Sequence, residues 1–342
     1  MSKFDKINYI ITDKKRKNIF QIIIESIHAS FLEKENPFFY FYNLLYKKNS
    51  SDYKNYIGMK KRNKILTNFY TEHQKEFTDK IKFNKILTSN NIPTPYILAY
   101  SKKYKIYHNS KEYTINNKEE FRSFLEKIIN DSATKSIFIK PLDGSGGSHA
   151  FKFNHKTLNL KDIERLLTLM RHQEFIFQET IIQNNSMKNI YPDSINTLRI
   201  YTYLDREKNK VEIILALLRV GSKGSIVDNE SMFVEVDIEN RWTLKGDAKS
   251  FLHNGGKSYE NHPDTGFEFN GFHLPFQEEI YKILGEAALL LPKDYIGWDV
   301  ALSENGPTII EANDRPHILM TQIMAGGFKG HPKYKKILKD FI

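Results

Sequence analysis

Apolar positions along this chain follow two different periods. Residues 13–75 are mostly helical in pattern, and Ile19, Ile23, Ile27 and Phe31 fall on one face of a predicted helix. Further helices are predicted from Asp79 to Leu87 and over residues 119–129. Short apolar, partly β-branched runs predict strands, over residues 96–100, 136–140, 174–182, 197–204, 211–220, 296–302 and 308–312. This mixture predicts an α+β fold, with a change of pattern near residue 76.

The helical segment of residues 1–75 is an N-terminal extension in this prediction. Its first strong helix follows a basic run, Lys14 to Lys17, and an aromatic segment from Pro37 to Tyr46 comes next. Two interpretations fit this pattern. It is either a helical cap packed on the rest of the protein, which we favour because its apolar faces are broad, or a basic amphipathic element that touches a membrane surface. We expect the remaining chain to divide into residues 76–182 and 183–342.

Residues 296–316, IGWDVALSENGPTIIEANDRP, combine a predicted β-hairpin with a spaced set of oxygen ligands. Glu311 and Asn313 lie two residues apart and so share one face of the second strand. A loop centred on Asn305 places Asp299 opposite Glu311, whereas a two-residue Asn-Gly loop places it opposite Ala312. With the odd loop, Asp299, Glu311 and Asn313 form an all-oxygen cluster suited to Mg²⁺, or to Mn²⁺ in its place.

A lysine at the end of a predicted strand precedes a glycine-rich loop. Lys140 is followed by PLDGSGGSH, in which the glycines allow backbone N–H groups to approach phosphate oxygens. The loop has neither the order of a Walker motif nor that of a dinucleotide fingerprint. The alternative is an ordinary flexible turn.

Charged residues also occur within apolar strands. Gln178 and Glu179 interrupt EFIFQETII, and Arg199 and Arg219 lie in two further apolar runs. A buried arginine pairs with a carboxylate or binds an anion, because its planar fork fits carboxylates and phosphates. The sequence leaves both alternatives open.

Composition narrows the class of protein. The 342 residues carry a net charge of +10, which favours acidic partners, and contain no cysteine, which excludes disulfides and thiolate chemistry. We see neither a signal peptide nor an apolar run of about 18 residues. We therefore expect a cytoplasmic protein, with peripheral contact at the inner face of the membrane as an open alternative.

The order of these features resembles the ATP-grasp superfamily over about residues 76–328. The resemblance is to the ATP-grasp group associated with sugar transfer and polysaccharide biosynthesis, and it rests on four ordered segments, SINTLRIYTYL, LLRVGSKGSIVDN, HPDTGFEFNGFHLP and GWDVALSENGPTIIEAN. It implies an ATP-grasp fold, in which two α+β subdomains clamp ATP.

The resemblance also implies roles for individual residues. Lys80 and Lys140 would contact the ATP phosphates, and Gly144, Ser145, Gly146, Gly147 and Ser148 would close over them as a lid. Glu179 would accept a hydrogen bond from the adenine amine, beside a hinge of Gln178, Thr180, Ile181 and Ile182. Asp299, Glu311 and Asn313 would hold Mg²⁺. Arg199, Arg219 and Arg315 would surround the γ-phosphate and the acceptor carboxylate.

On the acceptor side the resemblance implies Asn229, and Lys249, His149 and His262 are further candidates for substrate binding. The two histidines are either acid–base groups or, as we favour, structural or substrate-positioning residues. Ser231 follows Val227-Asp228-Asn229 where relatives tend to carry a Gly-Gly pair shortly afterwards, which leaves the acceptor open.

The function that the resemblance implies is ATP-dependent ligation of a carboxylate and an amine through an acyl phosphate. The carboxylate would belong to a small molecule or glycan, such as a uronic acid in capsule or other cell-surface polysaccharide synthesis. One alternative is a kinase on the same scaffold that phosphorylates a hydroxyl group. Another is a basic polyanion-binding protein, although we expect no nucleic acid partner.

Overall fold

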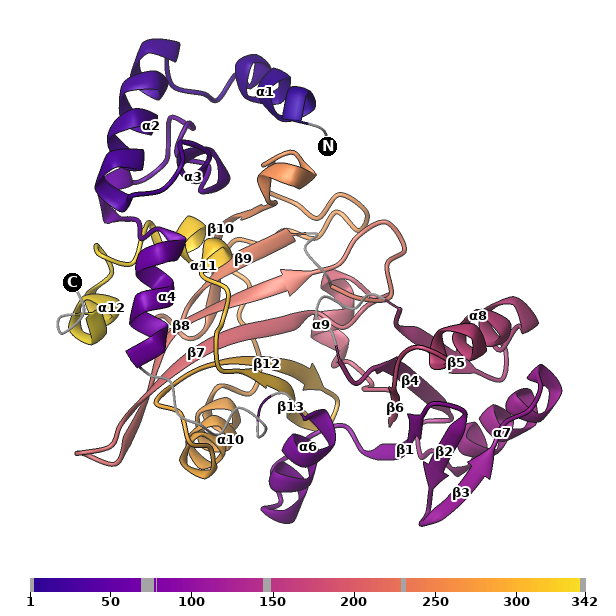
Figure 1. Cartoon of the computed structure of the whole chain (residues 1–342). Coiled ribbons are helices and arrows are strands. Elements are labelled where there is room, and N and C mark those ends of the chain that lie inside the picture. The colour runs from indigo at the N-terminus through magenta and orange to yellow at the C-terminus, as the bar shows by residue number, and fades with distance from the viewer. Residues whose placement is uncertain (1–2, 69–76, 78, 144–148, 229–231, 339–342) are drawn as a thin grey trace.

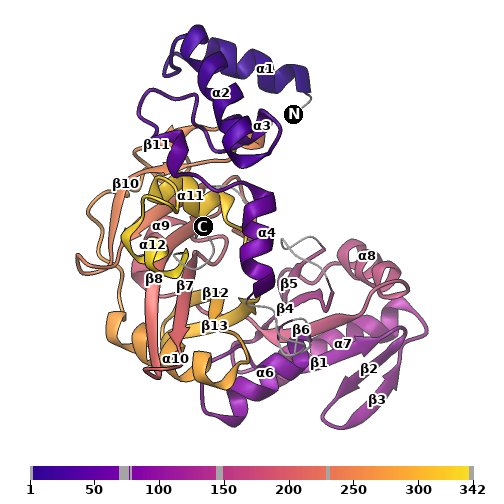
Figure 2. The same ribbon diagram turned by 60° about the vertical axis from the view of Figure 1, so that its left-hand side comes forward.

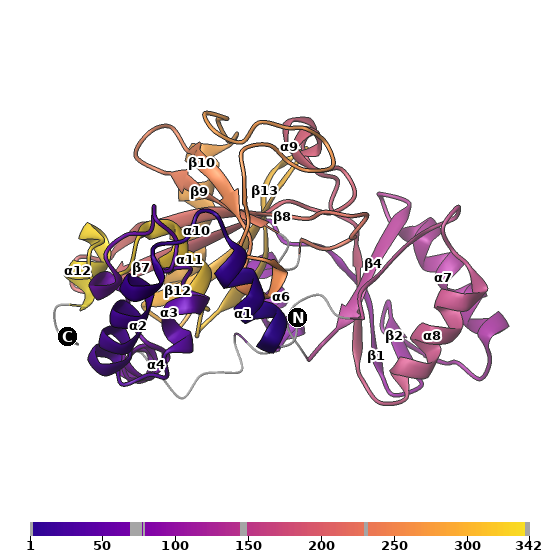
Figure 3. The same ribbon diagram turned by 90° about the horizontal axis from the view of Figure 1, so that it is seen from above.

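The computed structural model describes residues 3–68, 77, 79–143, 149–228 and 232–338. Two antiparallel sheets organise these residues. Figure 1 shows the larger sheet in the centre, the smaller one beside it, and the N-terminal helices above. Seen from above, the smaller sheet and its helices form a lobe of their own (Figure 3).

The smaller sheet has six strands in the order β3-β2-β1-β6-β4-β5. Their bounds are Lys111–Thr114, Lys105–His108, Ile97–Lys102, Phe175–Glu179, Ser136–Pro141 and Phe151–Asn154 in that order. The helices α7 (Lys118–Asp131) and α8 (Leu160–Met170) cover one face. Ile137 and Ile139 of β4 point into that core together with Phe175 and Phe177 of β6. Because side chains alternate along a strand, Lys140 and Gln178 project from the opposite face.

The larger sheet has seven strands in the order β11-β10-β9-β8-β7-β12-β13. Their bounds are Ser258–Tyr259, Thr243–Lys249, Met232–Asp237, Lys210–Val220, Thr197–Asp205, Tyr295–Ser303 and Gly306–Asn313 in that order. The short elements α9 (Asn185–Ile190) and η2 (Leu252–Asn254) lie in its connections. All the pairings described for both sheets are antiparallel.

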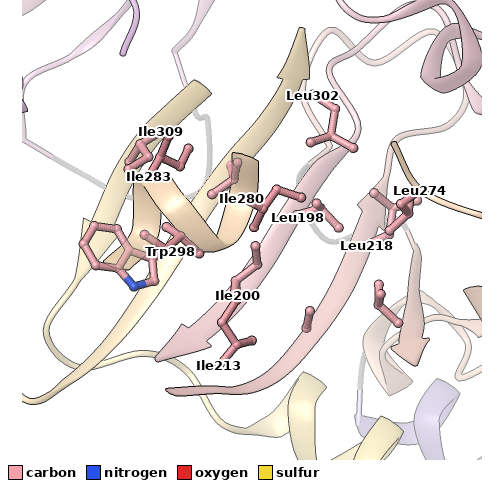
Figure 4. Packing of buried hydrophobic residues seen from close by; sticks show 14 of the residues in the cluster. Leu198, Ile200, Ile213, Leu218, Leu274, Ile280, Ile283, Trp298, Leu302 and Ile309 are labelled. Carbon is pink, nitrogen blue, oxygen red and sulfur yellow. The ribbon is translucent and has the colours of Figure 1, made fainter. Parts of the chain in front are cut away.

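One face of the larger sheet packs against α10 (Gln277–Leu290). Figure 4 shows Ile280 and Ile283 of α10 meeting Leu198 and Trp298 from the strands. The helix α6 (Lys80–Ser89) joins the same core through Phe83 and Leu87. By packing, α6 therefore lies with the larger sheet, although we had grouped it in sequence with residues 76–182.

The other face of the larger sheet carries the N-terminal segment, part of which packs on the rest of the protein, as the cap interpretation predicts. This segment contains α1 (Lys3–Thr12), α2 (Ile19–Glu33), α3 (Phe38–Tyr42), η1 (Tyr53–Asn55) and α4 (Met59–Asn68). Residues of α3 and the following turn share a core with Leu217 and Phe233 of the sheet and with α11 (Leu319–Ala325). The last helix, α12 (Pro332–Leu338), adds Tyr334 to a neighbouring cluster.

The face of α2 that we predicted from Ile19, Ile23, Ile27 and Phe31 exists, but it does not join the core. All four side chains are exposed, and the buried positions of α2 are Ile22, Ser26, Ala29 and Glu33. No helix in the described ranges combines the length and the apolar character that crossing a membrane requires.

Candidate active site

Five predicted site residues lie on one face of the larger sheet. Asp299 of β12 pairs in register with Arg199 of β7 on one side and with Glu311 of β13 on the other. Asn313 follows Glu311 by two residues on β13, and Arg219 of β8 lies diagonally next to Arg199. This is the face opposite to α10, so the sheet presents a polar row directed toward the smaller lobe and the N-terminal segment.

The predicted pairing of Asp299 with Glu311 is correct, but the predicted odd loop is wrong. Ser303 pairs with Gly306, so the turn holds two residues, and this register continues to Val300 opposite Ile309. Unbroken, it would place Asp299 opposite Ile310. A β-bulge between these positions shifts the register by one residue and brings Glu311 opposite Asp299.

Asp299 is the centre of a buried charge network. Arg199 donates from Nε to Oδ1 at 2.5 Å and from Nη2 to Oδ2 at 3.0 Å, and Arg219 donates from Nη2 to Oδ2 at 3.2 Å. Arg199 and Asp299 are only 7% and 4% exposed. The forked geometry of this pair is that of a strong, charge-assisted interaction.

The pKa values in this network follow from burial and from the opposite charges. Burial alone would raise the pKa of Asp299, but Arg199 and Arg219 outweigh it and hold that pKa below its usual range. Burial opposes the charge of Arg199, and the adjacent Asp299 nevertheless raises the pKa of the guanidinium. Both groups are therefore ionised at neutral pH.

Arg219 has a second carboxylate nearby. Its Nε lies 3.3 Å from Oδ2 of Asp228, but these two buried atoms do not meet in hydrogen-bonding geometry. Burial raises the pKa of Asp228 despite the neighbouring Arg219. Asp228 is therefore an acidic neighbour of the site. Sequence reasoning did not single it out as a functional residue, although it belongs to the segment LLRVGSKGSIVDN that carries the family resemblance.

Lys80 and Lys140 bring positive charge to the same region from other elements. Lys80, the first residue of α6, donates from Nζ to the backbone oxygens of Pro141 (3.0 Å) and Leu142 (2.7 Å), just after β4. Burial, together with Lys140, lowers the pKa of Lys80. Burial also lowers the pKa of Lys140, while Glu311 and Asp299 oppose that change. The charge of Glu311, on β13 of the larger sheet, thus acts on Lys140, on β4 of the smaller sheet.

The expected role of the Glu179 carboxylate does not fit its position. Glu179 pairs with Ile137 and so projects toward the helix-covered face, where its Oε1 accepts from the backbone N–H of Ala133 at 2.8 Å. Gln178 pairs with Phe138 and projects from the same face as Lys140. Gln178, and not Glu179, is thus the polar hinge side chain on the face of Lys140. Its Nε2 also donates to the Pro95 oxygen at 3.4 Å.

Backbone hydrogen bonds tie the hinge segment of residues 180–182 to both sheets. Thr180 donates from its N–H to the oxygen of Ser136 at 3.2 Å, and the oxygen of Ile182 accepts from Glu304 at 3.0 Å. The other crossing segment is fixed in the same way, because Pro93 accepts from Ile309 at 2.9 Å. Both connections between the lobes therefore attach to the β12–β13 hairpin that carries Asp299 and Glu311.

The oxygen atoms of Glu311 and Asn313 fit a hard cation that takes its remaining ligands from phosphate and water. Asn313 donates its amide Nδ2 to the oxygen of Gly297 at 3.4 Å, an orientation that leaves Oδ1 as an acceptor. Glu311 supplies a carboxylate two residues away on the same face. Asp299, in contrast, directs both oxygens to arginines, so it has other partners than the predicted metal. Mg²⁺ is usually bound by one or two protein carboxylates, with phosphate and water oxygens as its other ligands. No cluster of three or more His, Cys, Asp or Glu side chains that could hold a metal occurs in the described residues.

Arg315 lies at the end of the hairpin and is exposed. Arg62 of α4 donates from Nη2 to the backbone oxygens of Arg315 (2.7 Å) and Pro316 (2.9 Å). Figure 2 shows α4 descending beside the body toward the strands of the site. Sequence reasoning missed Arg62, because an arginine in a lysine-rich helix gives no sign of a partner about 250 residues away.

The predicted substrate-binding residues have different environments. His262 is buried. Its Nδ1 accepts from the backbone N–H groups of Asp264 (3.1 Å) and Thr265 (3.3 Å), so Nε2 carries the proton and donates to the Gly221 oxygen at 2.9 Å. Both nitrogens are thus used structurally, which corrects the substrate-binding prediction in favour of its structural alternative.

His149 and Lys249 remain candidates. The Nδ1 atom of His149 lies 3.1 Å from the side-chain oxygen of Gln173. Lys249 and Arg219 pair with Phe233 from opposite sides and therefore share one face. Burial lowers the pKa of Lys249, and its Nζ donates to the Ile323 oxygen at 3.3 Å. Gly144, Ser145, Gly146, Gly147, Ser148 and Asn229 lie outside the described residues.

Comparisons with known proteins show which family model and which solved structures the chain resembles. A family model described as sugar-transfer associated ATP-grasp matches residues 61–333. No curated protein matches the chain.

Similar solved structures include the ATP-grasp ligase PsnB complexed with minimal precursor, Mg and ADP, at 15% identity and a TM-score of 0.41, covering 77% of this chain and 58% of that one. D-alanyl-alanine synthetase A from Vibrio cholerae matches at 12% identity and a TM-score of 0.44, with 78% and 64% covered. VanG D-Ala:D-Ser ligase from Enterococcus faecalis matches at 13% identity and a TM-score of 0.42, and the match covers 78% of this chain and 62% of that one. The chain thus spans less than two thirds of the length of each.

Proposed function

The chain belongs to the sugar-transfer-associated ATP-grasp family, and from this membership we propose that it is an ATP-dependent carboxylate–amine ligase. The observation that carries the proposal is the convergence of two lysines with an arginine–carboxylate network. The charge of Glu311 acts on both Lys80 of α6 and Lys140 of the smaller sheet, while Arg199 and Arg219 bind Asp299, the cross-strand neighbour of Glu311. Fixed positive charge of this kind suits phosphates and a carboxylate acceptor.

The proposed reaction joins two steps. The oxygen of an acceptor carboxylate attacks the γ-phosphorus of ATP, so that ADP leaves and an acyl phosphate forms. An amine then attacks the acyl carbon, which forms the amide, expels inorganic phosphate and releases a proton. Mg²⁺ would neutralise phosphate charge when bound by Glu311 and Asn313. The enzyme otherwise works by alignment and by stabilising charge that spreads over the phosphoryl oxygens.

Each group of residues has a part in this proposal. Lys80 and Lys140 hold the phosphates, and the backbone of residues 180–182 holds the base, with Gln178 on the same face as Lys140. Asp299 keeps the two arginines oriented, and Arg219 together with Arg315 meets the reacting groups. Lys249 shares a face with Arg219, and in this proposal it attracts the acceptor carboxylate. We propose a carboxylated sugar of a cell-surface glycan as that acceptor, because the family is associated with sugar transfer.

Calorimetry with ATP tests the nucleotide site. We expect Mg²⁺-dependent ATP binding to the wild type and its loss in the Glu311→Ala/Asn313→Ala double variant, because both proposed protein ligands of the cation are removed. Glu304→Ala/Asn305→Ala, in the turn of the same hairpin, is the matched control and should bind normally. Absence of binding at about 1 mM ATP, a typical upper limit for enzyme substrates, would contradict the proposal.

Product analysis tests the reaction type. Release of ADP and phosphate is measured with a uronic acid alone, with an amino acid alone, and with one of each together. A ligase requires both acceptors and releases free phosphate, whereas retention of the phosphoryl group on a hydroxyl would identify a kinase.

The hinge makes a separate prediction about base recognition. Glu179→Gln should leave the Kd of ATP within about twofold, because the Glu179 side chain faces the Ala133 N–H on the far side of the sheet. Gln178→Ala should weaken ATP binding by about tenfold, the usual effect of losing one hydrogen bond without replacement. Calorimetry on both variants provides the measurement. If Glu179→Gln is the weaker binder of the two, the carboxylate has the adenine role that the family resemblance implied.

A further inference from the structure

The helix α2 is oriented with its apolar side outward. Phe20 and Phe31 are 80% and 81% exposed, and Ile24 and Ile27 are each 61% exposed. With Ile19 and Ile23 they cover an arc of about 140° at 100° per residue. Two of the four buried positions are polar, Ser26 and Glu33. A continuous apolar surface of this kind on a folded protein indicates a binding surface.

Polar anchors prevent α2 from turning this surface inward. Glu33 is buried and accepts from the backbone N–H of Gly58 at 2.8 Å and from Lys61 and Lys329. Glu25 accepts from Lys17 and from the hydroxyl of Tyr40, both at 2.6 Å. Rolling the helix would break these interactions and would leave the buried Glu33 carboxylate without its partners, which costs several kcal/mol in a typical protein. The exposure of the apolar side is therefore built into the fold.

The charge around α2 indicates what covers it. Residues 1–68 hold fourteen Lys and Arg against six Asp and Glu, so they carry a formal +8 of the chain's +10. Lys14 and Lys15 are exposed just before α2, and Lys34 is exposed at its C-terminal cap. Pairing α2 with a second copy would bring two such basic segments together and would be opposed by repulsion. An anionic surface with an apolar interior is complementary to both features.

We propose that α2 docks in the plane of an anionic phospholipid surface. The six residues of its apolar side, Ile19, Phe20, Ile23, Ile24, Ile27 and Phe31, enter the boundary between headgroups and acyl chains, and Lys14, Lys15 and Lys34 contact the lipid phosphates. Figures 1 and 2 both show α2 in the outermost lobe, away from the smaller sheet. Docking through α2 thus leaves the candidate active site free. The proposal does not depend on the reaction that the site carries out.

Vesicle flotation with the full chain tests this docking. The wild type should float with phosphatidylcholine vesicles that contain about 30% phosphatidylglycerol and bind pure phosphatidylcholine at least about tenfold more weakly. Phe20→Ser/Phe31→Ser should lower binding to the anionic vesicles by about tenfold or more through lost apolar burial. Leu160→Ser/Leu289→Ser, which replaces two exposed leucines on α8 and α10, is the matched control and should bind as the wild type does.

The basic residues are tested separately. Lys14→Gln/Lys15→Gln should weaken binding to the anionic vesicles by about thirtyfold, on the basis of about 1 kcal/mol for each of the two lysines near an anionic surface. Raising the salt concentration should also weaken wild-type binding. Circular dichroism shows whether the variants keep their fold, and none of these residues belongs to the candidate site. Equal flotation of the wild type and Phe20→Ser/Phe31→Ser would overturn the proposal. So would a wild-type dimer that this variant converts to a monomer without any vesicle binding, as measured by light scattering.

Discussion

Replacing Asp299 with asparagine is expected to lower the free energy of unfolding by about 3–5 kcal/mol, the typical effect of breaking a buried ion pair from one side. The asparagine fits the space, but it leaves two guanidinium groups without their common counter-charge. Arg199 cannot turn to water, because it is 7% exposed on a central strand. Urea denaturation at neutral pH measures the change.

Asp294→Asn is the matched control for this substitution. Asp294 lies directly before β12 and forms an ion pair with Arg206, but both side chains are substantially exposed. A pair of this kind contributes at most about 1 kcal/mol. If the two variants lose the same stability, the network around Asp299 is not the structural centre that we describe.

The pH dependence of the Asp299 variant follows from the direction of its pKa shift. The arginines hold the pKa of Asp299 below its usual value of 3.8. The stability contributed by the pairing is therefore fully present above pH 3.8 and is lost as the pH falls through the lower folded-state pKa. The stability difference between wild type and Asp299→Asn should remain constant from pH 7 to about 4 and shrink below it. A difference that already shrinks between pH 6 and 5 would contradict this assignment.

The main features of the larger sheet could be predicted from sequence, because its strands have strong local patterns. The pairing of Asp299 with Glu311 was predicted correctly for a reason that proved wrong. A turn of two residues and a β-bulge at Ile310 together bring Glu311 opposite Asp299, as the odd loop would. Bulges depend on contacts with neighbouring strands and leave little trace in a single sequence. The strand pairing at the candidate site could therefore be predicted, but not its local geometry.

The sequence did not reveal which side of a helix or strand faces the protein interior. Periodicity places Ile19, Ile23, Ile27 and Phe31 on one side of a helix, yet it does not say whether that side is buried. The buried carboxylate of Glu33, bound to Lys61 and Lys329, decides the question through partners far along the chain. In the same way, strand alternation separates Gln178 from Glu179, but only the position of α7 shows which of the two faces the helices.

The two alternatives for the buried arginines prove compatible. Arg199 is paired with a carboxylate, as a buried arginine usually is, and Arg219 extends the pair toward solvent with a side chain that is 20% exposed. A carboxylate that orients one arginine can thereby orient a second that remains accessible to an anion. We therefore expect Asp299 to act at the site by orienting both arginines, without contacting a cation.

Replacing Arg315 with alanine is expected to lower the turnover number by about 10³, the lower end of the effect of a transition-state arginine in phosphoryl transfer. The Kd of ATP should change by less than about threefold, because charge stabilisation that develops during the reaction does not contribute to ground-state binding. The variant should fold normally, since the Arg315 side chain is exposed and Arg62 holds the loop through the backbone oxygens of Arg315 and Pro316. ADP release under single-turnover conditions, together with ATP calorimetry, separates the two effects.

Arg122→Ala provides the comparison for this variant. Arg122 is an exposed arginine of α7 that pairs with Glu126 of the same helix, in the lobe away from the hairpin. Its removal changes the net charge by the same amount and should leave both turnover and ATP binding unchanged. An equal loss in the two variants would point to a general electrostatic effect of net charge. Near-normal turnover of Arg315→Ala would remove Arg315 from the catalytic assignment and leave Arg219 as the accessible guanidinium that meets the transferred phosphoryl group.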